Sequence, residues 1–304
     1  MAISRAQLVK ELEPGLNALF GLEYKRYDNQ HAEIYTNESS DRAFEEEVML
    51  SGFANANVKV EGSGVNYDQA QETYSARYTH DTIALAFAIT EEAIEDNLYD
   101  KISSRYTKAL ARSMSNAKQV KAAAPLNNGL PTADGFDSGD GVSLFNTSHT
   151  TVSGTNVKNT LTTQADLNET SLEQALIDIS AFTDERGLRV AAKGVKMIIP
   201  SANQFSAERL LKSQGRTGTA DNDINAVVSM GMVPQGYRVN NFLTDSDSWY
   251  IITDVPNGMK MFTRAPLTTA MEGDFDTGNV RYKARERYSF GVSDYRGIFG
   301  CEGA

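Results

Sequence analysis

The sequence has one cysteine among its 304 residues, Cys301, and this excludes a framework of internal disulfides. It has no apolar run long enough to cross a membrane. Its first residues mix charges with apolar side chains and lack the core of a signal peptide. These absences predict a folded chain that is made and kept in a cytoplasm and has no membrane partner.

Motifs that carry chemistry are also missing. The sequence has no GxxxxGK[ST], no GxGxxG after a strand, and no HExxH, CxxC or GxSxG motif. The three histidines, His31, His80 and His149, lie far apart and share no ligand spacing. The stretch 135–141 is a poor calcium loop, because its ligand spacing fails and no glutamate closes it. We therefore expect no cofactor, no metal and no catalytic group. An α/β enzyme using His149 or His80 remains as the catalytic alternative.

Positive charge is scarce overall but concentrated near the C-terminus. The chain carries a net charge of −11, which argues against a general nucleic-acid binder but allows local basic patches. Four cations alternate with other residues in one predicted strand, and a period of two places them on one face: Arg281, Lys283, Arg285 and Arg287. This face is either solvated or pairs with an acidic surface on another copy of the chain.

A long helix is predicted over residues 90–124, which contain neither proline nor glycine. Thr90 is a suitable N-cap, acidic residues follow it, and Pro125 with the next turn residues is expected to end the helix. About 34 residues at 1.5 Å each give a rod of roughly 50 Å, better suited to a strut across a flat molecule than to a globule. Its expected apolar stripe consists of Ile94, Leu98, Ile102, Tyr106, Leu110, Met114, Ala117 and Val120.

The segment before this helix predicts a projecting β-hairpin. Residues 58–62 and 74–90 alternate as strands, with a register change near Asp81 and a polar, glycine-bearing tip between them. Its composition gives it little core, so it needs a partner to be ordered. Upstream we expect a short amphipathic helix interrupted at Pro14, and a solvated helix or arm over 41–49.

After the helix, a loop rich in Gly, Ser, Thr and Asn over 126–165 marks a domain boundary. An α/β segment follows. We expect a helix capped by Asn168 or Thr170 and a buried strand over 195–200. Further expected elements are a helix capped by Ser201, a short helix at 221–230, strands at 237–243 and 249–255, and a hairpin that turns at 256–258 into 259–263.

This order of parts resembles the HK97-fold major capsid proteins of tailed bacteriophages over nearly the whole chain. The stretches ARYTHDTIALAFAITEEAIEDNLYD (76–100), ISSRYTKALARSM (102–114) and ARERYSFGVSDYRGIFG (284–300) are similar to the Mu-like major head subunit group. The resemblance implies an α+β, HK97-like capsid fold. Its parts would be an N-terminal arm (1–45), an extended β-hairpin or E-loop region (46–89), a peripheral domain with the spine helix and Gly/Ser-rich loop (90–165), an α/β axial domain (166–255), and return strands to the peripheral domain (256–304).

The resemblance also implies a function. Such chains self-assemble as hexamers and pentamers into an icosahedral shell around double-stranded DNA, which they contact non-specifically. The protein would be part of the virion and would assemble in the host bacterial cytoplasm. Only about 40 residues precede the hairpin, which favours a separate scaffolding protein, with a portal and a decoration protein as further partners. An encapsulin-like shell around a cargo enzyme is the alternative.

The resemblance and the charge pattern together select candidate subunit-interface residues. They lie on the predicted hairpin, at the start of the long helix and on the basic strand. These residues are Lys59, Glu61, Tyr74, Tyr78, Glu91, Glu92, Glu95, Arg281, Lys283, Arg285 and Arg287.

Overall fold

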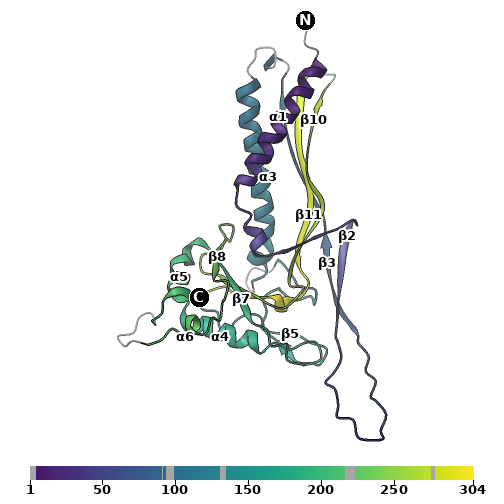
Figure 1. The fold of residues 1–304 in the computed structure, drawn as a ribbon, viewed down its shortest axis with the longest axis vertical. Helices are drawn as coiled ribbons and strands as arrows, with labels where there is room; N and C mark the ends of the chain where they lie inside the picture. The colour runs from purple at the N-terminus through teal and green to yellow at the C-terminus, as the bar shows by residue number, and fades with distance from the viewer. Residues whose placement is uncertain (1–4, 91, 94–98, 131–134, 216–222, 275–277) are drawn as a thin grey trace.

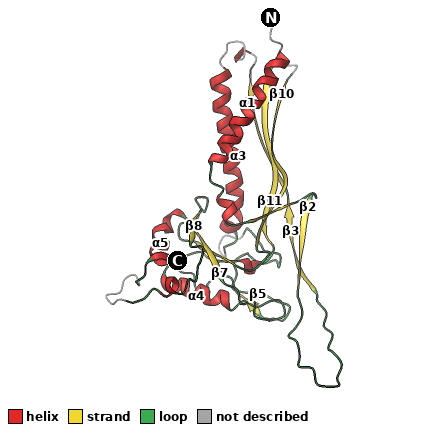
Figure 2. Cartoon of the chain, in the orientation of Figure 1, coloured by secondary structure: helices red, strands yellow, loops and turns green. Residues whose placement is uncertain are grey.

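The computed structural model describes residues 5–90, 92–93, 99–130, 135–215, 223–274 and 278–304. It is a mixed α+β fold with two four-stranded sheets (Figures 1 and 2). One sheet and two long helices form an elongated upper part, the second sheet and shorter helices form a lower part, and a hairpin projects away from both. The α+β class agrees with the sequence-based expectation.

The first sheet has the strand order β1-β10-β11-β4. Its strands are β1 (Thr36–Ser39), β10 (Met259–Gly273), β11 (Val280–Val292) and β4 (Asp81–Ile89). β1 runs parallel to β10, and the other pairs are antiparallel. Helices α1 (Arg5–Arg26) and α3 (Tyr99–Asn128) lie along one side of this sheet (Figure 1).

The long helix α3 ends later than predicted. Pro125 lies inside it, and the helix continues to Asn128. Its last turn is held by packing and by external donors: Ala122 and Leu126 are buried, and their carbonyls accept hydrogen bonds from the hydroxyls of Tyr35 (2.7 Å) and Tyr250 (3.1 Å). Tertiary contacts therefore override the local effect of the proline.

The predicted apolar stripe of this helix is partly wrong. Leu110 and Met114 are buried as expected, but Tyr106 and Val120 are 52% and 51% exposed. The buried side also includes polar residues such as Thr107 and Gln119, which apolar periodicity does not detect. Ile94, Leu98 and the side chain of Ile102 lie outside the part of the chain that the structure describes.

Helix α1 is continuous through Pro14, so the predicted interruption is also wrong. Its side chains Leu16 and Phe20 pack against Leu110 and Met114 of α3 in a separate core cluster. Burying a side chain of this size contributes about 1.5–3 kcal/mol, comparable with the cost of about 3 kcal/mol for an interior proline.

The projecting hairpin uses different strands from those expected. β2 (Phe44–Leu50) pairs antiparallel with β3 (Glu72–Thr79), so the acidic run predicted as a solvated helix or arm is a strand. Residues 58–62, predicted as a strand, belong to the loop over 51–71. The side chains of β2 alternate between exposed and half-buried, as expected for a strand with one covered face. The valines of 58–62 are exposed and do not pair with another strand. The predicted register change is confirmed: β3 ends at Thr79 and β4 begins at Asp81.

The second sheet has the order β12-β9-β7-β8. Its strands are β7 (Gly194–Ile199), β8 (Tyr237–Val239), β9 (Trp249–Thr253) and β12 (Ile298–Cys301). Helices α4 (Glu169–Ser180), α5 (Gln204–Lys212) and α6 (Ala226–Ser229) accompany it, with the short pairs and turns β5 (His149–Thr150), β6 (Asn156–Val157), η1 (Gln30–Glu33), η2 (Ser201–Asn203) and η3 (Tyr295–Gly297). Asn168 caps α4 as predicted, through a capping box with Ser171.

Two predicted connections of this part differ in the structure. The turn at Asn257, with φ +60°, is present, but β9 and β10 belong to different sheets and form no hairpin. The last strand, β12, pairs with β9 rather than joining the first sheet. The turn therefore passes the chain from one sheet to the other, which turn chemistry alone does not reveal.

One large core cluster holds the two parts together. It joins residues of β7, β9, β12 and α4 to the end of α3 and to Met261 and Tyr288 of the first sheet. The two sheets thus share a continuous interior. Across the described residues, no helix is both long and apolar enough to cross a membrane.

Candidate assembly interface

The loop over 51–71 is the most exposed segment of the chain. Val58 and Tyr67 are 94% and 97% exposed, and Val60 and Val65 are exposed as well. Apolar side chains in this state leave unburied surface that a partner can cover. Two candidate residues, Lys59 and Glu61, lie exposed in the same loop.

The hairpin is anchored to the first sheet by a buried lysine. Lys260 of β10 is 5% exposed, and its Nζ lies 2.5 Å from Glu47 of β2 and 3.1 Å from Glu38 of β1. Burial alone would lower the pKa of Lys260, but the hydrogen bonds from these two carboxylates raise it. Glu47 also accepts a hydrogen bond from Ser293, the residue that follows β11. One charged residue therefore joins the hairpin to the edge strand.

Tyr74 and Tyr78, both interface candidates, pack within their own chain. Tyr78 is 2% exposed, its ring meets Phe262 edge-on at 4.8 Å, and its hydroxyl bonds to Ser293. Tyr74 is half-buried against the ring of Tyr295, at 6.3 Å between centroids. Burial raises the pKa of both tyrosines well above its ordinary value. Their alternation with exposed neighbours was predicted, but it serves to seat β3 on the body.

The predicted basic face of β11 is present. Arg281, Lys283 and Arg285 are exposed and Arg287 is half-buried, while Tyr282, Ala284, Glu286 and Tyr288 between them are buried. The residues opposite these cations on β4 and β10 are mostly small: Ala84, Ala86, Ala88, Thr82, Ala265, Thr268 and Ala270. The cationic side chains therefore stand above a flat surface. Arg281 is paired with Asp274.

The acidic candidates at the start of the long helix are described only in part. Glu92 is exposed, and Thr90 caps this turn by accepting a hydrogen bond from the backbone N–H of Ala93 at 3.4 Å. Glu91 and Glu95 lie outside the described residues.

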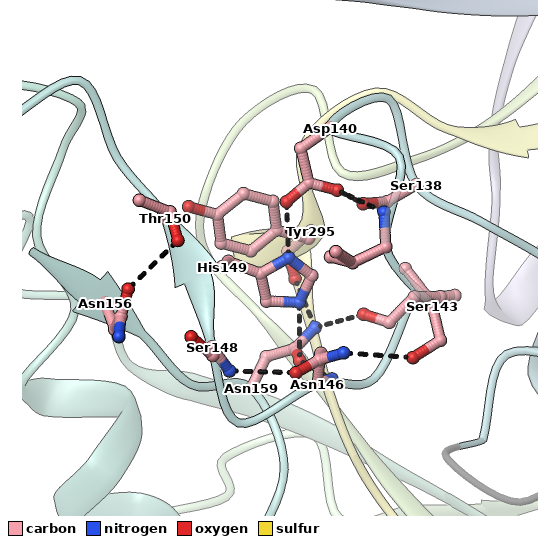
Figure 3. A network of polar contacts seen from close by, with 12 residues as sticks. Ser138, Asp140, Ser143, Asn146, Ser148, His149, Thr150, Asn156, Asn159 and Tyr295 are labelled. Atoms are coloured by element: carbon pink, nitrogen blue, oxygen red, sulfur yellow. Dashed lines mark hydrogen bonds and ion pairs between the residues drawn. The ribbon is translucent and has the colours of Figure 1, made fainter. Parts of the chain in front are cut away.

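His149 lies in a buried polar network that the sequence did not predict (Figure 3). The ring is fully buried and stacks on Tyr295 with centroids 3.9 Å apart. Its Nδ1 lies 2.6 Å from Asp140 and its Nε2 lies 3.1 Å from the Oδ1 of Asn159. Burial alone would raise the pKa of Asp140, but hydrogen bonds from His149 and Ser138 lower it below its ordinary value. The network fixes the loop after α3 to the C-terminal segment.

Neither histidine of the catalytic alternative is placed for catalysis. Both ring nitrogens of His149 are engaged, and its side chain has no access to a substrate. His80 is 5% exposed, and its two nitrogens bond at 2.9 Å to the hydroxyls of Ser289 and Ser40. Cys301 is buried, and burial raises the pKa of its thiol, which makes it a poor nucleophile.

A second buried network was also missed. Arg296 is 2% exposed, and its guanidinium lies 2.6 Å from Glu185 and 3.2 Å from Asp294. Burial raises the pKa of Asp294, although Arg296 opposes this effect. Arg296 and Glu185 are 111 positions apart in the sequence, so no local pattern could have predicted their contact.

The architecture defines the class of protein: a long helix beside a twisted sheet, a second α/β layer and a projecting hairpin form the HK97-type capsid fold. The phage capsid protein family model matches residues 73–300. The chain belongs to this family and is a phage capsid protein, a structural and non-enzymatic component of a shell. No curated protein matches the sequence significantly.

Solved structures share the fold at low sequence identity. The capsid of an empty GTA particle has a TM-score of 0.59 at 14% identity, over 91% of each chain. The procapsid of bacteriophage JBD30 has a TM-score of 0.54 at 14% identity, over 99% of this chain and 77% of that one. A virus-like particle from Pyrococcus furiosus has a TM-score of 0.53 at 12% identity, over 95% and 98%. At such identities the likeness concerns the fold.

Proposed function

We propose that the chain assembles as hexamers and pentamers into a closed shell that encloses double-stranded DNA. The observation that carries this proposal is the loop over 51–71, which presents several exposed apolar side chains and has no core of its own. A single copy gains nothing by projecting such a loop into water, whereas a neighbouring copy can cover it.

In this proposal two further surfaces contribute weaker contacts. The basic face of β11 pairs with acidic surface on another copy, for which Glu92 and Glu61 are exposed candidates. Exposed ion pairs contribute about 0–1 kcal/mol each, so many of them are needed and a misplaced copy can still leave. Repetition by symmetry then multiplies contacts that are individually weak.

The proposal also names the capsid subgroup, the site of assembly and the partner proteins. We place the chain in the Mu-like major head subunit group, on the three stretches quoted above. Assembly takes place in the host bacterial cytoplasm with a separate scaffolding protein, a portal and a decoration protein, and the enclosed DNA is contacted without sequence specificity. An encapsulin-like shell around a protein cargo is the alternative. The ratio of absorbance at 260 and 280 nm in nuclease-treated particles separates the two.

The loop provides the decisive test. We expect a Val58→Ser/Val60→Ser/Val65→Ser/Tyr67→Ser variant to unfold at the wild-type temperature, because these side chains have no partner within the chain. Its yield of closed shells in negative-stain electron microscopy should fall strongly.

A matched control changes polar residues of the same loop: Asn55→Ser/Asn57→Ser/Asn66→Ser. We expect this control to form shells normally. Wild-type shell yield from the apolar variant would refute the role of the loop, and so would deletion of Gly62–Gln71 without effect. A wild-type chain that stays small even with its scaffolding partner would refute shell formation itself.

A further inference from the structure

Helix α3 has a charge opposite to that of the whole chain. Its sequence contains six basic residues and one acidic residue, a net charge of +5. The chain as a whole carries −11, so the remainder carries −16. A helix of this sign in an acidic protein attracts anions locally.

The cations of α3 fall into two groups by environment. Lys118 and Lys121 face the chain's own acids: Lys118 lies 3.1 Å from the buried Glu286, and Lys121 is paired with Asp81. The other group, Arg105, Lys108 and Arg112, is exposed. Spacings of three and four residues place these three on one edge of the helix. None of them forms an ion pair with a residue that the structure describes.

This edge borders a groove of about 590 Å³ between α3 and α1. Its lining consists of Lys108, Ala109, Arg112, Ser113 and Asn116 of α3 with Glu23 of α1 and Tyr27, the residue that follows α1. Glu23 is the one carboxylate in this lining, and it is already engaged: it accepts a hydrogen bond from Tyr27 at 3.2 Å and lies 3.8 Å from Arg26. The groove therefore presents two cations and small polar groups to an anion.

We propose that the exposed edge of α3 formed by Arg105, Lys108 and Arg112 contacts the phosphate backbone of the enclosed double-stranded DNA. This inference rests on the proposed function and adds which surface faces the DNA. Phosphate contacts require accessible cations and polar donors but no shape-matched pocket. An acidic polypeptide would need apolar anchors to bind well, and the groove lining offers only Ala109 and the ring edge of Tyr27.

The basic face of β11 is the competing surface, and its position favours subunit contacts instead. The root of the hairpin packs on that same face of the strand. Ser289 and Gly291 lie two and four residues after Arg287, so they are on the same face of β11 as the cations. Ser289 bonds to His80, and a Cβ on Gly291 would lie 2.6 Å from the ring of Tyr78. The hairpin thus leaves the body beside this row of cations. Arg105, Lys108 and Arg112 of α3, in contrast, remain exposed in the part of the chain that the structure describes.

The test measures binding of a fluorescein-labelled 30-base-pair DNA to the purified, unassembled full chain by fluorescence anisotropy over a series of low salt concentrations. Three triple variants remove the same charge. The test variant is Arg105→Gln/Lys108→Gln/Arg112→Gln, the competing variant is Lys283→Gln/Arg285→Gln/Arg287→Gln, and the matched control in the second part is Arg189→Gln/Lys193→Gln/Arg209→Gln. Thermal unfolding verifies that each variant is folded.

Each lost phosphate contact lowers the slope of log K against log salt by about 0.9, so we expect the α3 variant to lower it by about 2–3. The other two variants should leave the slope at its wild-type value. An equal fall in the control variant, a larger fall in the β11 variant, or an unchanged slope in the α3 variant would each overturn the inference. So would binding of polyglutamate that is tighter than that of DNA and lost in the α3 variant.

Failure of this inference can be separated from failure of the proposed function. Electron microscopy of the wild-type protein reports shell formation independently of the DNA-binding slope. Shells with an unchanged slope in the α3 variant refute only the assignment of this surface.

Discussion

Buried polar side chains in this protein constrain where protons can reside, and His149 is the clearest case. Its Nδ1 faces the carboxylate of Asp140 and its Nε2 faces the Oδ1 of Asn159. Asn159 uses its Nδ2 to donate to the carbonyls of Leu144 and Tyr295, so its Oδ1 must accept. Both ring nitrogens therefore face hydrogen-bond partners inside the protein, and the hydrogen bond between His149 and Asp140 helps to hold the pKa of Asp140 below its ordinary value.

A His149→Phe variant tests this arrangement. Phenylalanine keeps an aromatic ring on Tyr295 but leaves Asp140 without its buried partner. Breaking a buried pair in this way costs about 3–5 kcal/mol, and we expect a loss of that size in the free energy of unfolding by urea. A double variant with Asp140→Asn should recover part of the loss. A loss below about 1 kcal/mol in the single variant would contradict a stabilising role for this buried hydrogen bond.

His31 predicts a pH dependence of stability. Burial, and secondarily the positive charge of Lys118, lowers the pKa of His31 to about 4. An unfolded chain has a histidine pKa of about 6.5, so between these values the unfolded state binds more protons than the folded state. Stability should therefore fall as pH drops from about 6.5 to 4, by about 3 kcal/mol at most from this residue. A His31→Gln variant should remove this part of the dependence in unfolding curves at pH 7 and pH 4.5.

At the scale of elements, two glycines allow a turn and a helical turn to lie directly against each other. The turn from β9 to β10 passes Gly258 against Gly297 of η3, and a Cβ on Gly297 would lie 2.3 Å from the Cα of Gly258. We expect Gly297→Ala to destabilise the chain by about 1–3 kcal/mol, because backbone must move. Gly15→Ala is the control: nothing lies within 4 Å of its added Cβ. Removing a helical glycine there should stabilise by about 0.5–1 kcal/mol. Equal effects in thermal unfolding would refute the steric account.

Sequence patterns identified the elements whose determinants are local. Alternation located β11, the expected buried strand over 195–200 corresponds to β7, and a side-chain cap located α4. They failed where distant packing decides. Pro14 and Pro125 stand inside helices because facing residues and tyrosine hydroxyls stabilise them, and the valines of 58–62 form no strand because nothing pairs with them. The same limit applies to the candidate site. The exposed cations were visible from spacing alone, whereas Lys260 and its two carboxylates come from three separate strands.

At the scale of the whole molecule, the proposed charged contacts between copies predict that assembly depends on salt. An Arg285→Glu/Arg287→Glu variant reverses half of the basic face of β11. We expect it to weaken shell formation, more so at low salt, where Coulomb contacts between copies are less screened. Light scattering at 50 and 500 mM salt would measure this difference. An unchanged yield at both concentrations would show that the basic face of β11 is solvated and makes no contact between copies.

The hairpin loop contacts the body at a second point, in addition to the contacts at its root. Arg186, in the turn after α4, donates to the carbonyl of Gln69 at 2.6 Å and lies 3.6 Å from Asp68. The loop is thus supported from two different parts of the body, and its direction is restricted before any neighbour arrives. Docking a restricted loop loses less conformational entropy than docking a free one. A share of the ordering needed for assembly is therefore already completed in the isolated subunit, during its own folding.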